Sequence, residues 1–190
     1  MNLELTNITE KDLPLIVFSD TTSGFFEFLI KWRTRGSYNH AMWSAHKGLF
    51  ASQGNTYSEV PYSRYTTHGK RLKFFQILDL SIIDRNRIIS SIEMKLEKPW
   101  YKKMYDWLGI VGQVVGVDWL NDPALEYCSE DVAHHIFYMA NLLPDNFYKK
   151  KILLSIPRHA SPEELNEYFK KYPEVFRVYG EWDSDLEDEK

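Results

Sequence analysis

The chain has a single cysteine, and its surroundings could support nucleophilic chemistry. Cys128 follows an aromatic residue, and acidic residues come within the next turn, in the run Glu126-Tyr127-Cys128-Ser129-Glu130-Asp131. The apolar spacing after this run is helical, which predicts that Cys128 stands at the N-terminal end of a helix. The unpaired backbone N–H groups and the helix dipole at that end favour an anion, so the thiol would be shifted toward thiolate.

A thiolate nucleophile needs a base, and His40 is the candidate. It opens a strand-like run, His40-Ala41-Met42-Trp43, far upstream of Cys128. Both residues also have simpler interpretations. A lone cysteine is most often a buried small hydrophobe, and a strand histidine can be an ordinary hydrogen-bonded one. Spacing alone does not bring the two together.

Two further histidines follow Cys128 on the predicted helix. His134 and His135 lie about two turns in, and Asp131 and His135 form an i,i+4 pair. A zinc site would need more converging ligands than these residues supply, and the cysteine is better explained as a nucleophile. We therefore expect no metal and no cofactor.

Several short motifs, taken in order, resemble the circularly permuted papain-like cysteine hydrolases. This is the permuted branch of the NlpC-type superfamily, which includes YiiX-like proteins. The motifs are an apolar strand over 15–20, a helix ending near Thr34, Asn39-His40 before a strand, Tyr105-Asp106, and Cys128-Ser129-Glu130 opening a helix. The resemblance covers about residues 13–170. In that family the cysteine is the nucleophile and the histidine its base, so the resemblance implies these roles for Cys128 and His40.

The residue that would orient His40 departs from the family pattern. Relatives commonly supply a carboxylate from the next strand, whereas the equivalent stretch here, 49–53, contains no acid. An antiparallel neighbour presents alternate residues to one face, so either Gln53 or Ser52 can reach the ring. We expect Gln53, because its side chain is longer, with Ser52 as the second choice. Glu59 is the nearest downstream acid, and its simpler interpretation is a solvated strand residue.

Composition and charge limit the classes of function. A chain of 190 residues that is 44% hydrophobic suits one domain with one substantial core. We expect that domain over residues 1–180 and an acidic, flexible tail over 181–190. A net charge of −4 without a long basic block argues against a nucleic-acid partner. No signal peptide or membrane-spanning stretch is visible, which favours a cytoplasmic protein, or a phage-encoded one delivered without a cleaved signal.

The pattern of elements predicts an α+β domain. Strands are expected over 13–19, from His40, and over 49–53, 56–61 and 71–80. Helices are expected over 24–33, 84–97, 106–115 and 130–142, and after a capping box at Ser161. The resemblance implies a circularly permuted papain-like fold, with a small antiparallel sheet packed on helices.

The leading function is a cysteine hydrolase that cleaves an amide or an ester through an acyl-enzyme. The resemblance implies a peptide, peptidoglycan-like or lipid amide substrate. Two alternatives stay open. One is a non-catalytic binding or structural module on the same fold, for example a phage component, and the missing carboxylate favours it. The other is a thiol acyltransferase, which would use the same cysteine with an amine or alcohol in place of water.

Overall fold

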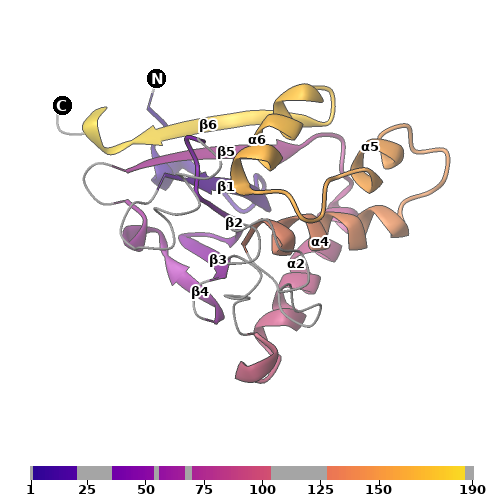
Figure 1. Ribbon diagram of the computed structural model, residues 1–190, viewed down its shortest axis with the longest axis horizontal. Coiled ribbons are helices and arrows are strands. Elements are labelled where there is room, and N and C mark those ends of the chain that lie inside the picture. The colour runs from indigo at the N-terminus through magenta and orange to yellow at the C-terminus, as the bar shows by residue number, and fades with distance from the viewer. Residues whose placement is uncertain (1, 21–35, 54–55, 67–69, 104–127, 187–190) are drawn as a thin grey trace, which may run out of the picture.

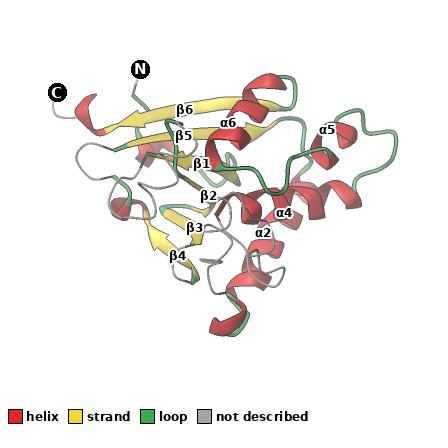
Figure 2. Ribbon diagram, in the orientation of Figure 1, coloured by secondary structure: helices red, strands yellow, loops and turns green. Residues whose placement is uncertain are grey.

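The protein is a mixed helix and sheet structure built on one antiparallel sheet, so the α+β class is confirmed (Figures 1 and 2). The computed structural model describes residues 2–20, 36–53, 56–66, 70–103 and 128–186. The sheet has six strands in the order β4-β3-β2-β1-β5-β6. Their bounds are β1 Leu15–Ser19, β2 His40–His46, β3 Leu49–Gln53, β4 Tyr57–Pro61, β5 Arg71–Ile77 and β6 Phe176–Asp183.

The helices lie against one face of this sheet. They are α2 Ile82–Leu96, α4 Cys128–Leu142, α5 Lys150–Leu154 and α6 Pro162–Lys171. The described residues also form short 3₁₀ turns, which are η1 Leu5–Asn7, η2 Tyr62–Arg64, η3 Trp100–Lys102 and η5 Ser184–Leu186. Predicted helices over 24–33 and 106–115 lie outside the described residues. No helix in the described ranges is long and apolar enough to cross a membrane.

The sheet buries both of its faces, each in its own apolar cluster. One cluster joins Ala41 and Trp43 of β2 to Val132 and Ile136 of α4. The other contains Met42 of β2, together with Val17, Phe50, Phe74 and Trp182. Successive side chains of a strand point to opposite faces, so this alternation shows which β2 residues face the helices. Ala41 and Trp43 do, and Met42 faces away.

Local sequence signals account for where two of the helices begin. The Ser81 side chain accepts a hydrogen bond from the Asp84 backbone N–H and so caps α2, which starts two residues earlier than predicted. Before α6, Ser161 and Glu164 form the predicted capping box, with Pro162 in the first turn. Each cap satisfies a backbone N–H that the helix itself leaves unpaired.

The C-terminal segment corrects one prediction. Residues 181–183 belong to β6 and residues 184–186 to η5, so the flexible tail expected from residue 181 is wrong for these six positions. Trp182 is buried in the second cluster, and Glu181 forms an ion pair with Lys73 at 2.7 Å. Pairing with β5 therefore orders an acidic stretch that looks solvated in the sequence. Residues 187–190 lie outside the described residues.

Candidate active site

Cys128 is the first residue of α4, as predicted, and the helix continues through His134 and His135. The thiol therefore lies at the end of the helix where the dipole favours an anion. The side chain is buried, with 1% of the residue exposed. The next residue anchors this turn, because Ser129 Oγ donates a hydrogen bond to the Ala160 carbonyl at 2.5 Å. The first turn of α4 is thus held against the segment that leads into α6.

His40 is the first residue of β2 and pairs with Ser19 of β1. Its ring is almost enclosed, with 9% of the residue exposed. Ring atom Nε2 lies 2.8 Å from Ser52 Oγ, and Ser52 Oγ lies 2.8 Å from the Tyr65 hydroxyl. The Tyr65 ring also stacks on the imidazole, with centroids 5.7 Å apart and planes 9° apart. Two neighbours therefore hold the imidazole, one at its edge and one at its face.

Burial sets the protonation state of this histidine. Loss of hydration lowers the pKa of His40 to about 4, although the Asp131 carboxylate acts in the opposite direction. The imidazole is therefore neutral near pH 7 and able to accept a proton. Ser52 occupies Nε2, and no hydrogen-bond partner of Nδ1 is found among the described residues. Nδ1 is thus the ring nitrogen that no described residue occupies, whichever nitrogen carries the proton.

The strand predicted to orient His40 is the one that does so. The contact comes from Ser52, the second choice, and the side chain of the first choice, Gln53, lies outside the described residues. Trp43 pairs with Ala51, which sets Ser52 beside Met42 on the face that His40 shares. The ring therefore has a hydroxyl group of β3 as its hydrogen-bond partner.

Glu59 contacts His46, not His40. Its Oε1 lies 2.5 Å from His46 Nδ1, and Glu93 of α2 lies 3.3 Å from the other ring nitrogen of His46. The Glu59 hydrogen bond is the largest cause that raises the pKa of His46 above its ordinary value. This pair joins β2, β4 and α2 at the far end of β2 from His40. Glu59 therefore contacts His46 as a partner and lies away from the candidate base.

A buried polar cluster lies one turn after Cys128. Asp131 Oδ1 is 2.7 Å from Lys95 Nζ of α2 and 3.2 Å from His135 Nε2, and Ser91 Oγ is 2.7 Å from His135 Nδ1. Burial alone raises the pKa of Asp131, but Lys95 and His135 outweigh it and the pKa lies below its usual range. Asp131 therefore stays ionised in the interior.

Sequence reasoning missed Lys95, although a signal for it was present. Lys95 lies three residues after Ile92 and seven after Ile88, both of which are buried on the same face of α2. A lysine at a core position of a helix requires a buried anion as its partner. Asp131, on the helix that packs against α2, is that partner.

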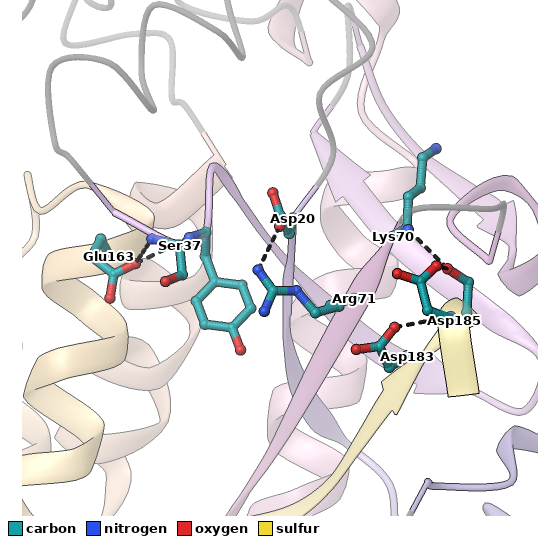
Figure 3. A network of polar contacts seen from close by, with 9 residues as sticks. Asp20, Ser37, Lys70, Arg71, Glu163, Asp183 and Asp185 are labelled. Carbon is teal, nitrogen blue, oxygen red and sulfur yellow. Dashed lines mark hydrogen bonds and ion pairs between the residues drawn. The ribbon is translucent and has the colours of Figure 1, made fainter. Parts of the chain in front are cut away.

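A set of polar contacts holds the end of the sheet where β2 begins (Figure 3). Glu163 of α6 accepts hydrogen bonds from the backbone N–H groups of Ser37 and Tyr38, at 2.5 and 3.0 Å. Arg71 of β5 forms an ion pair with Asp20, the residue after β1, at 3.0 Å (Figure 3). The two hydrogen bonds to Glu163 attach the segment before His40 to α6, so the position of the candidate base depends on a helix near the C-terminus.

His40 and Cys128 are not in direct contact. Among the described residues, no hydrogen bond joins the His40 ring to the thiol. Strand alternation puts His40 on the Met42 face of β2, whereas α4 packs on the Ala41 and Trp43 face. The first turn of α4 acts on the His40 ring only through Asp131, whose carboxylate raises the pKa of the imidazole against the effect of burial.

No group of three or more His, Cys, Asp and Glu side chains is arranged to hold a metal ion in the part of the chain that the structure describes. The Tyr105-Asp106 motif lies outside that part. Comparison of the chain with family models, with curated proteins and with solved structures finds no match.

Proposed function

We propose that this protein is a cysteine hydrolase that cleaves an amide or ester through an acyl-enzyme on Cys128. The observation that carries the proposal is the position of Cys128, the only cysteine of the chain, at the N-terminal end of α4. Asp131, three residues after Cys128, acts electrostatically on His40, whose neutral ring is hydrogen-bonded to Ser52. A thiol at a helix N-terminus and a neutral histidine are the two groups from which an activated cysteine is built.

The proposed reaction begins with transfer of the thiol proton to His40 Nδ1. The thiolate attacks the substrate carbonyl, and His40 then returns the proton to the leaving amine or alcohol. Water, activated by the same nitrogen, releases the acid and restores the thiol. The backbone N–H groups at the start of α4 are suited to stabilise the oxyanion that forms in each step. Ser52 keeps Nε2 occupied throughout, so that Nδ1 stays the reacting nitrogen.

The substrate class follows from the resemblance described above. An amide-linked peptide, a peptidoglycan-like peptide or a lipid amide would suit this chemistry. The buried thiol sets a further requirement, because the carbonyl must reach Cys128. The His40 ring must also meet the thiol around the start of β2, since the strand itself separates the two faces.

Labelling with iodoacetamide tests this proposal, because Cys128 is the only cysteine and intact mass reports its modification alone. The wild-type protein should label near pH 7 faster than global unfolding allows. His40→Gln should slow labelling by roughly 10²-fold, the lower end of general-base contributions. The matched control is His134→Gln, which changes an exposed histidine of α4, the helix that contains Cys128. This variant should label like the wild type. An activated ester should also leave its acyl group on Cys128.

Two results would overturn the hydrolase. One is a labelling rate that equals the rate of global unfolding, which would mean that the native thiol is inaccessible. The other is equal labelling of wild type and His40→Gln, which would mean that His40 does not act on the thiol. Thermal unfolding of each variant at pH 7 confirms that the comparison is made on folded protein.

A non-catalytic binding module is the second candidate, and one observation favours it. Cys128 and His40 are both buried, and strand alternation places His40 on the face of β2 opposite to the one on which α4 packs. In such a module both residues serve packing. The protein would then bind an amide-containing ligand without forming the acyl-enzyme, and the ester experiment would leave the mass of the protein unchanged.

A further inference from the structure

We propose that Tyr65 is a positioning residue that selects the tautomer of His40, by accepting a hydrogen bond from Ser52 and by stacking on the imidazole. The inference rests on the proposed hydrolase only for its consequence in catalysis. The contacts that carry it join Tyr65, the residue after η2, to β3 and β2, and none of them involves Cys128. Tyr65 would take the place of the carboxylate that the permuted papain-like family, which the sequence resembles, carries on the equivalent strand.

The direction of the hydrogen-bond chain decides which ring nitrogen carries the proton. A serine hydroxyl can donate to a histidine nitrogen or accept from it. When Ser52 donates to the Tyr65 oxygen, 2.8 Å away, its lone pairs are left to accept from His40 Nε2–H, also at 2.8 Å. His40 then carries its proton on Nε2 and keeps a lone pair on Nδ1. In this direction of the chain, Nδ1 is the basic nitrogen.

The stacked ring has a second effect, on the protonated state. The two planes differ by 9° and the centroids lie 5.7 Å apart, so the rings are parallel and within the range of a cation–π contact. An aromatic face attracts a cation, and the attraction is stronger away from water. Asp131 of α4 is the charged group that acts on this ring, and it also favours the imidazolium. Tyr65 therefore stabilises the cation that forms when His40 accepts a proton.

The same surroundings provide a matched control. Tyr62, in the same 3₁₀ turn region, stacks on Phe50 with centroids 4.3 Å apart, and its hydroxyl hydrogen-bonds to Ser44 Oγ. It is therefore a tyrosine with the same kinds of contact, directed at a serine that does not touch His40. Tyr62→Phe removes a comparable hydroxyl from the same apolar cluster and leaves the Ser52 chain intact.

The experiment is NMR of the full-length protein with ¹⁵N-labelled histidine, which reports the tautomer and the titration midpoint of His40. His40→Gln assigns the signal. We expect Nε2–H in the wild type and in Tyr62→Phe. In Tyr65→Phe, Ser52 loses its acceptor and donates to Nε2, so the proton should move to Nδ1. In Tyr65→Leu the loss of the stack should lower the midpoint by about half a pH unit.

The proposal fails if Tyr65→Phe keeps the Nε2–H tautomer while thermal unfolding shows that it is folded. It also fails if the wild type itself carries the proton on Nδ1. These outcomes are separate from those of the hydrolase. A tautomer switch in Tyr65→Phe, combined with labelling of Cys128 that does not depend on His40, would support the role of Tyr65 and overturn the hydrolase.

Discussion

His40 should make the protein less stable in acid, and replacing it should remove that sensitivity. The pKa of His40 is lowered from 6.5 to about 4 by burial, with Asp131 opposing the change. In the unfolded chain the imidazole is solvated and titrates near its ordinary pKa. Between these two values the unfolded state binds a proton that the folded state does not. The free energy of unfolding therefore falls as the pH falls through this window.

The size of the effect follows from the difference of about 2.5 pKa units, at about 1.36 kcal/mol per unit. The full loss is about 3 kcal/mol, and about 2.5 kcal/mol of it should occur between pH 7 and pH 4.5. For a domain of this size that corresponds to roughly 5–10 °C in Tm. The contribution is fully present above pH 6.5, and below pH 4 no further loss arises from this group.

Urea denaturation of wild type and His40→Gln at pH 7, 6, 5 and 4.5 measures this term. Other groups contribute equally to both proteins, so the difference between them isolates His40. The stability advantage of the wild type at pH 7 should shrink by about 2.5 kcal/mol at pH 4.5. His134→Gln, which alters an exposed histidine, should keep the wild-type dependence. Parallel curves for wild type and His40→Gln would refute the reasoning, because His40 would then titrate near its unfolded pKa.

Three further changes probe the framework of the site by urea denaturation or thermal melting. Lys95→Met leaves the Asp131 carboxylate without its nearest cation and should cost about 3–5 kcal/mol at pH 7. Adding Asp131→Leu should recover most of that loss, and strictly additive losses would contradict the ion pair. Gly36→Ala should destabilise by about 1–3 kcal/mol, because a Cβ there would lie 2.5 Å from the Glu163 Cβ. Stability equal to wild type would show that Glu163 moves aside freely. Ser161→Ala removes the capping box of α6 and should cost about 1 kcal/mol; an unchanged Tm would show that the cap contributes nothing.

Local pattern was enough to predict most of the described elements. The strand at 49–53, the helix behind Cys128 and the capped helix α6 depend on residues that are neighbours in the chain. Apolar spacing and capping side chains act over three or four positions, so the sequence shows them directly. The position of Cys128 at a helix start belongs to this class.

β6 could not be predicted in this way. Its residues, Phe-Arg-Val-Tyr-Gly-Glu-Trp-Asp, mix charged and aromatic side chains and end in an acidic stretch. It is a strand because it pairs with β5, which lies about a hundred residues earlier in the chain. Backbone pairing at that separation depends on how the whole sheet assembles, and no local signal reports it.

The candidate site also combines features that depend on local sequence with contacts that depend on the fold. The sequence by itself determined that Cys128 opens a helix and that His40 opens a strand whose neighbour lacks an acid. Only the tertiary structure decided that Ser52 holds Nε2, that Tyr65 of another segment stacks on the ring, and that Lys95 meets Asp131. Strand register, burial and helix packing set these contacts. Each brings together side chains from separate elements, and their distances are defined only once the core has formed.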